Sequence, residues 1–236
     1  MNKKTILSIC FVCLLLFMVC GTLHAETVEE TLVKNFPGAD FDSIKPTDIK
    51  GVYEVVKGSE IIYYVPDPGY VISGDIFDKE GVNITERRRN ELAAAKAKGL
   101  PLDKAIKVGN GKNIVVEFTD PDCSYCRAAS SFLSQRKDVT LYIFFFPLMS
   151  HQDAENKIKY IFCAKDRAKA YEDAMAGKLD DQKYEKCSKP EATDLLKLHK
   201  EIGQTMGIKG TPYFIINWKK QVMGANVEEI EGALEK

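Results

Sequence analysis

The chain has 236 residues, of which 45% are hydrophobic and 10% aromatic, and its 33 basic and 34 acidic side chains give a formal net charge of −1. This length can hold one or two domains with a sizeable core, and the composition excludes a disordered or fibrous chain. The balanced charge provides no basic field, so we expect no nucleic-acid partner. The seven cysteines are odd in number, and only their positions can show what they do.

Residues 1–25 have the pattern of a cleavable export signal. Lys3 and Lys4 precede a hydrophobic run over residues 6–20, and Ala25 supplies a small residue at the cleavage position. The run is shorter than the roughly 20 residues of a membrane-spanning helix, although an uncleaved anchor is an alternative. Cleavage would remove two lysines and no acidic residue, which changes the net charge to −3, and would leave four cysteines in a compartment that permits disulfides.

Residues 26–85 have the pattern of a small α+β unit. Hydrophobic residues recur at helical spacing over 27–36, and Pro37 and Gly38 follow. Short β-rich runs come next, at residues 52–56, 61–65, 71–72 and 75–77, with a hairpin turn expected at residues 57–60. A unit of about 60 residues buries little surface alone, so we expect it to form a homodimer.

Residues 86–105 are expected to link this unit to a second domain. The alanine-rich, charged run 86–98 favours a helix that enters at Asn83 or Thr85 and ends before Gly99 and Pro101. Its hydrophobic face is thin, which is typical of a linker helix.

Residues 106–236 alternate between strand and helix patterns, which favours an α/β layered domain. We predict strands at 114–119, 139–146, 213–217 and 221–223, and helices at 126–135, 154–177 (as two helices), 190–206 and 227–234. Pro190 suits the first turn of its helix.

A Cys-x-x-Cys motif at Cys123 and Cys126 follows the first predicted strand of this domain and opens its first helix. Two intervening residues let the two sulfurs meet across one helical turn. The helix N-terminus favours a thiolate at Cys123, with Arg127 as a nearby cation, which makes Cys123 the attacking sulfur and Cys126 the resolving one. A second such motif, at residues 10–13, lies inside the export signal and has no chemistry to perform.

A structural zinc site and an inert disulfide are the alternatives for this motif. Zinc needs four ligands, and the remaining cysteines, Cys163 and Cys187, are not a second close pair. Outside the signal, the histidines are His151, for which we expect a loop or cap role, and His199, which we expect to be solvated. We therefore favour redox chemistry, with no metal or organic cofactor.

Thr211 and Pro212 precede the predicted strand 213–217. A cis bond there could hold an extended substrate backbone near the sulfurs, although most X–Pro bonds are trans.

The run 118–126 and the Gly-Thr-Pro sequence at 210–212 resemble the periplasmic disulfide isomerases of the DsbC/DsbG type, and the run 162–177 resembles their helical insert. The resemblance covers the mature chain and implies a thioredoxin-like domain at 106–236 behind a dimerisation domain. It also implies a periplasmic V-shaped homodimer, a cis bond between Thr211 and Pro212, and a DsbD-type membrane reductase as electron donor.

Cys163 and Cys187 remain as a pair. They could shuttle electrons, but we favour a structural disulfide, and the resemblance points the same way. Closing a loop of ~25 residues would contribute roughly 3.5 kcal/mol in the chain-entropy model.

Glu117 lies six residues before Cys123. In other thioredoxin-fold proteins an acid at this offset lies beneath the cysteines and can accept the resolving thiol's proton, whereas the isomerase branch often has an apolar residue there. A buried carboxyl would have a raised pKa that suits proton transfer. A solvated acid at the strand end is the alternative.

Together these features predict an enzyme that isomerises or reduces wrong disulfides in exported client proteins. A reductase of sulfenylated cysteines, a dimeric chaperone without essential redox activity and a net oxidase are the rival functions.

Overall fold

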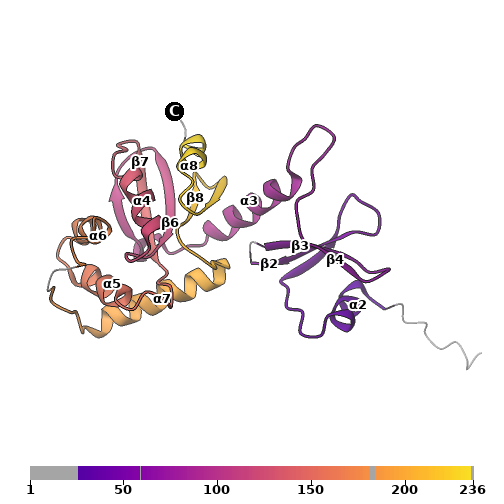
Figure 1. The fold of residues 1–236 in the computed structure, drawn as a ribbon, viewed down its shortest axis with the longest axis horizontal. Helices are drawn as coiled ribbons and strands as arrows, with labels where there is room; N and C mark the ends of the chain where they lie inside the picture. Colours follow the sequence, from indigo (N-terminus) through magenta and orange to yellow (C-terminus); the bar gives the residue numbers. More distant parts are fainter. Residues whose placement is uncertain (1–25, 59, 181–183, 235–236) are drawn as a thin grey trace, which may run out of the picture.

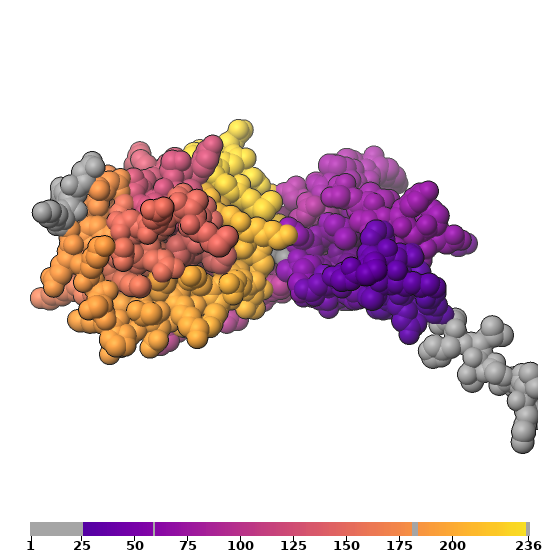
Figure 2. Space-filling view, turned by 60° about the horizontal axis from the view of Figure 1, so that its bottom comes forward, coloured from indigo at the N-terminus to yellow at the C-terminus, as the bar shows by residue number. Residues whose placement is uncertain are grey.

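The computed structural model describes residues 26–58, 60–180 and 184–234. The predicted export signal lies outside the described residues. Figure 1 shows two units joined by helix α3 (Ile84–Ala97), and Figure 2 shows them as two lobes in contact with each other. Within the described part of the chain, no helix is both long enough and apolar enough to cross a membrane.

The N-terminal unit packs one helix against an antiparallel sheet. Its elements are α2 (Val28–Asn35), β1 (Ser43–Pro46), β2 (Tyr53–Lys57), β3 (Glu60–Val65) and β4 (Tyr70–Ile72), and the strands are adjacent in chain order. Helix α2 begins at Thr27, whose side chain and that of Glu30 form a capping box. Lys57 pairs with Glu60, which confirms the predicted hairpin.

The strand predicted at residues 75–77 is wrong. Phe77 makes only an isolated bridge to Asn83. The neighbouring backbone is bound to the start of α3 instead, because the N–H of Ile76 donates to Oγ1 of Thr85 over 2.8 Å. This segment therefore ties the N-terminal unit to α3.

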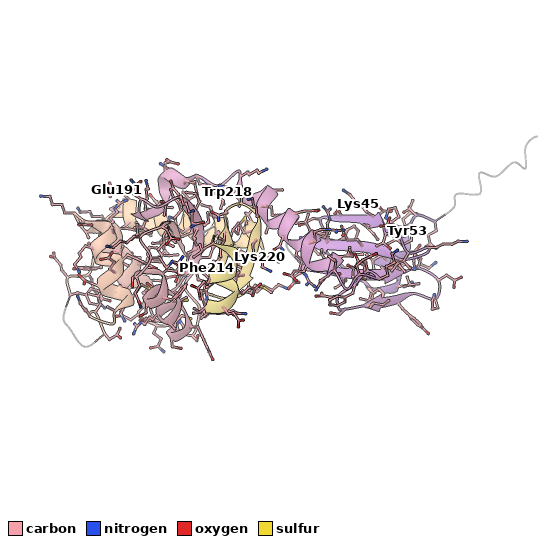
Figure 3. The ribbon with its side chains drawn as sticks, turned by 90° about the horizontal axis from the view of Figure 1, so that it is seen from above. Lys45, Tyr53, Glu191, Phe214, Trp218 and Lys220 are labelled. Carbon is pink, nitrogen blue, oxygen red and sulfur yellow. A yellow bond between two sulfur atoms is a disulfide. The ribbon has the colours of Figure 1, made fainter. Side chains whose placement is uncertain are left out.

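Helix α3 is more than a linker. It begins at Asn83, whose side chain accepts from the N–H of Glu86. Ala93 and Ala97 are fully buried against the sheet of the second unit, since small side chains allow close packing. Lys220 forms an ion pair with Glu86, and Figure 3 shows Lys220 and Trp218 on the side of the C-terminal unit that adjoins α3.

The C-terminal unit has a five-stranded sheet with helices on both faces. Its strands are β5 (Ile106–Gly109), β6 (Asn113–Thr119), β7 (Val139–Phe145), β8 (Tyr213–Ile216) and β9 (Lys220–Met223), in the order β5-β7-β6-β8-β9. Its helices are the short 3-10 turn η2 (Leu102–Lys104), α4 (Ser124–Leu133), α5 (Ala154–Cys163), α6 (Arg167–Met175), α7 (Pro190–Met206) and α8 (Val227–Ala233). The predicted α/β layering is confirmed, as is the division of 154–177 into two helices. Strand β5, a four-residue edge strand, was not predicted.

Strand β6 divides the core into two layers. Val115 belongs to the cluster that contains Cys126 of α4, while Val116 and Phe118 belong to the cluster that contains Ala93 of α3. Because side chains alternate along a strand, Glu117 lies on the same face as Val115, the face that α4 covers. The sheet thus brings a carboxyl group beneath the helix that carries the two cysteines.

Candidate active site

The two free cysteines stand at the start of α4, directly after β6. Cys123 is the N-cap residue, and its sulfur accepts from the N–H of Cys126 over 3.4 Å. Cys123 is 5% exposed and Cys126 is fully buried. Burial raises the pKa of the Cys126 thiol. Cys123 is therefore the more exposed of the two cysteines, and the Cys126 thiol stays protonated until a base takes its proton.

The Thr211–Pro212 bond is cis and lies beside Cys123. Strand β8 starts next to it and pairs antiparallel with β6, with Tyr213 opposite Phe118. This pairing brings the loop to the cysteines. The thiol of Cys123 donates a hydrogen bond to the carbonyl oxygen of Thr211, with 3.5 Å between Sγ and that oxygen.

A groove of about 570 Å³ runs past this loop. It is bounded on one side by Gly210, Thr211 and Pro212 and on the other by β3 of the N-terminal unit, from Glu60 to Ile62. Lys209 and Glu60 form an ion pair across the two units over 2.6 Å. Thr211, which lines the groove, is also the residue whose carbonyl oxygen lies 3.5 Å from Sγ of Cys123.

Glu117 is completely buried, so of the two alternatives for it the buried carboxyl is correct and the solvated acid at the strand end is not. Burial raises the pKa of its carboxyl to about 7. The hydroxyl of Tyr171, from α6, donates to Oε2 of Glu117 over 3.1 Å. The sequence alone did not single out Tyr171, because a tyrosine in an amphipathic helix is ordinarily a core residue.

Arg127, the cation that we expected near Cys123, is paired with acidic side chains. Its guanidinium binds both carboxylate oxygens of Asp180, at 2.5 and 2.8 Å, and also the carbonyl oxygen of Pro121. The 4%-exposed Lys157 joins the same cluster, with Nζ 2.5 Å from both Asp122 and Asp180. The cluster fixes the loop that precedes Cys123.

Asp120 holds the same loop from its other side. Its buried carboxylate accepts from the N–H groups of Asp122 and Leu148, and Nδ1 of His151 lies 2.8 Å from it. His151 thus has the loop role that we expected. The sequence had not indicated Asp120 or Lys157, since nothing in their spacing shows that they are buried.

The remaining cysteines are bonded to each other. The structure joins Cys163, the last residue of α5, to Cys187, with 6.3 Å between their Cα atoms. Their disulfide is part of the helical insert, which places it apart from the Cys123–Cys126 pair.

The expectation that His199 is solvated is wrong. It is fully buried among Phe144, Phe145 and Phe162, and burial lowers its pKa to about 4. Its Nδ1 accepts from the N–H of Phe145, and its Nε2 lies 2.9 Å from the carbonyl oxygen of Lys104. His199 therefore has a structural role. The sequence did not predict its burial, because the neighbouring residues along the chain include lysines and acids.

The described residues contain no cluster of three or more His, Cys, Asp or Glu side chains placed to hold a metal ion.

Comparisons with known proteins bear on both units. Residues 22–86 match the disulfide bond isomerase protein N-terminal domain, and residues 100–235 match the thioredoxin-like domain. The probable thiol:disulfide interchange protein DsbC of Bordetella pertussis is 29% identical over 205 residues, which cover 86% of this chain and 71% of that protein. The thiol:disulfide interchange protein DsbC of Escherichia coli is 28% identical over 197 residues, covering 80% of this chain and 78% of that protein.

A solved structure supports the fold. The ScsC variant of Proteus mirabilis with a linker deletion matches with a TM-score of 0.50 and 18% identity, over 61% of this chain and 80% of that one. The two family matches confirm the resemblance found in the sequence: the chain belongs to the thioredoxin-like domain family, in the DsbC-type group that carries the disulfide isomerase N-terminal domain.

Proposed function

We propose that this protein is a thiol–disulfide interchange enzyme that isomerises or reduces non-native disulfides in exported proteins. The observation that carries the proposal is the pair of free cysteines at the start of α4, with the sulfur of Cys123 at the N-cap and facing the loop of Thr211 and Pro212. The names of the DsbC relatives agree with it.

In the proposed reaction the Cys123 thiolate attacks a client disulfide, so that a Cys123–client S–S bond forms and a client thiolate leaves. That thiolate can attack elsewhere in the client and release Cys123 unchanged, which completes an isomerisation. Alternatively, Cys126 attacks Cys123, the mixed disulfide breaks, and the client leaves reduced while the enzyme keeps both sulfurs as a disulfide.

Glu117 is proposed to take the proton that Cys126 must lose in this second route. It lies on the sheet face that α4 covers, and its Oε1 has no hydrogen-bond partner among the described residues. A base works best when its pKa is close to the working pH, and burial gives Glu117 a pKa of about 7.

Thr211 and Pro212 are proposed to bind the client backbone. They line the groove of about 570 Å³, and the carbonyl oxygen of Thr211 lies 3.5 Å from Sγ of Cys123. Tyr125, in the middle of the motif, is 69% exposed, and its ring offers the client an apolar contact beside the reactive sulfur.

The protein is proposed to act as a homodimer in the periplasm. Strand β4 is an edge strand whose three residues, Tyr70, Val71 and Ile72, are all exposed, and such an edge can pair with a second copy.

Residues 1–25 would direct export, residues 26–85 would form the dimerisation domain, residues 86–105 the linker and residues 106–236 the catalytic domain. A DsbD-type membrane reductase would return Cys123 and Cys126 to the dithiol state. The bond between Cys163 and Cys187 would be structural.

Reactivation of scrambled ribonuclease tests this proposal. We expect wild-type protein to restore activity and the double variant Cys123→Ser/Cys126→Ser to fail, while both suppress client aggregation equally if a chaperone function is also present. Reactivation by the double variant would overturn the proposal. A protein that reduces sulfenylated thiols but leaves scrambled ribonuclease inactive would instead be a sulfenic-acid reductase. A pair found mostly as a disulfide in the cell would indicate a net oxidase.

A further inference from the structure

A buried row of hydroxyl groups continues from Glu117 away from the cysteines. The hydroxyl oxygen of Tyr171 lies 3.1 Å from Oε2 of Glu117 and 3.4 Å from Oγ of Ser130. A tyrosine has one hydroxyl hydrogen, so it can donate to either neighbour but not to both at once. Tyr171 can therefore switch its donor between the carboxyl group and the serine.

Ser130 brings this row to the surface. Tyr171 is 1% exposed and Ser130 is 8% exposed, and both line a groove of about 320 Å³. Arg136, Lys137 and Glu172 lie on the same groove, which gives it a polar rim where water can be held. The row thus joins a buried carboxyl group to solvent.

The groove opens on a different side of the unit from the client site. Cys123 caps the N-terminus of α4, whereas Ser130 lies seven residues further along that helix, on the same side as Cys126 one turn before it. At 1.5 Å per residue the separation along the helix axis is about 10 Å. A client that covers Cys123 would block direct access of water to the sulfurs but leave this groove open.

We propose that Tyr171 and Ser130 form a proton exit route that carries the proton of Cys126 from Glu117 to the groove behind the active site. The inference rests on the proposed function and on Glu117 as the first acceptor. When Cys126 attacks the mixed disulfide, its proton moves to Glu117 and the client thiolate leaves. Glu117 then donates to Tyr171, Tyr171 donates its own hydrogen to Ser130, and Ser130 donates to water. Each hydroxyl gains one proton and loses one, so neither becomes charged.

The groups that face Glu117 from the surrounding elements fit this route. They are the hydroxyls of Thr119 on β6 and Tyr171 on α6, with Ser130 of α4 next to Tyr171, while the neighbours across the sheet, Ile143 of β7 and Phe214 of β8, are apolar. Burial raises the pKa of Tyr171 well above its usual value, so its hydroxyl passes a proton on as a neutral group. Tyr171 and Ser130 are positioning residues, since neither touches the client.

Oxidation of the reduced protein by Ellman's reagent separates sulfur chemistry from proton release. The first aromatic thiolate leaves when Cys123 attacks the reagent's disulfide, and the second leaves when Cys126 attacks Cys123 and closes the protein disulfide. This second step frees one proton because the aromatic thiolate stays ionised. In a stopped-flow experiment at pH 8, absorbance reports the thiolate and an indicator dye reports the proton. Wild-type protein is expected to release the proton together with the second thiolate.

Tyr171→Phe and Ser130→Ala are expected to release the proton later than the second thiolate, with a proton rate constant lower by roughly tenfold or more. Tyr64→Phe is the control, because Tyr64 is also fully buried and its hydroxyl is also hydrogen-bonded to a side chain, that of Asn35, but it belongs to the N-terminal unit. Proton release that stays simultaneous with thiolate release in both variants would overturn the route, as would an equal delay in Tyr64→Phe. If the second thiolate were never released by wild-type protein, the proposed function itself would fail.

Discussion

The hydroxyl of Tyr171 donates to Oε2 of Glu117 over 3.1 Å, and both side chains are buried beneath the helix that carries Cys126. A carboxyl group in such a place is costly to ionise, because the protein interior solvates charge poorly. The hydroxyls of Thr119 and Tyr171 offset only part of that cost, so the pKa of Glu117 rises to about 7. This carboxyl can therefore change its charge within the physiological pH range.

We predict that Glu117 makes the protein less stable as the pH rises. Its pKa is about 7 in the folded chain against an ordinary 4.5, so between these values the folded state binds more protons than the unfolded state. Its contribution is intact below about pH 4.5 and is lost as the pH passes 7, a difference of about 3 kcal/mol. Glu117→Gln should remove this dependence. Urea unfolding of the reduced wild-type protein and the reduced variant at pH 5 and pH 8 measures this dependence. If their free energies of unfolding differed by the same amount at both pH values, the prediction would be contradicted.

His199 should act in the opposite direction on the acid side. Burial lowers its pKa to about 4 from an ordinary 6.5, so the unfolded state binds more protons between these values. Stability should fall by about 3 kcal/mol as the pH drops from 6.5 to 4. NMR titration of the imidazole gives a direct check, and a midpoint near 6.5 in the folded protein would show that the prediction is wrong.

Lys157 should be far more important for stability than lysines on the surface. It is 4% exposed and binds Asp122 and Asp180, so Lys157→Met leaves their carboxylates short of a cation and should cost roughly 3 kcal/mol. Lys200→Met is the control, because Lys200 pairs with Glu155 at the exposed surface, where such a pair contributes less than about 1 kcal/mol. Denaturant unfolding measures both variants. If Lys157→Met and Lys200→Met lost the same free energy of unfolding, the greater importance of Lys157 would be refuted.

The bond between Cys163 and Cys187 should stabilise the fold without taking part in the reaction. It closes a loop with a sequence separation of 24, for which the chain-entropy model gives about 3.5 kcal/mol. We expect Cys163→Ala/Cys187→Ala to lose approximately this stability and to retain reactivity of Cys123 at a temperature where the variant is folded. Loss of that reactivity in the folded variant would argue for a redox role of the pair.

The sequence indicated the elements that local patterns encode. The buried strands, the helix that the cysteines open, and the two helices of the insert followed from hydrophobic periodicity and from Pro and Gly positions. The chemistry of the site was also predictable, since the Cys-x-x-Cys spacing at a strand-to-helix junction is local.

Other features depend on packing between distant segments. His199 and Lys157 have charged neighbours along the chain, yet both are buried because other helices and strands cover them. Arg127 lies four residues from Cys123, but Asp180, far along the chain, binds its guanidinium. The contact between Tyr171 and Glu117 joins residues 54 positions apart. No local pattern contains such information.

Trapping of a mixed disulfide tests the central claim most directly. With a disulfide-containing client, Cys126→Ser should accumulate a covalent complex through Cys123, because the second cysteine that would resolve it is absent. The account predicts that non-reducing electrophoresis and mass spectrometry will show this complex for Cys126→Ser and none for Cys123→Ser. A complex of equal yield through Cys126 in the Cys123→Ser variant, or no complex in either one, would contradict it.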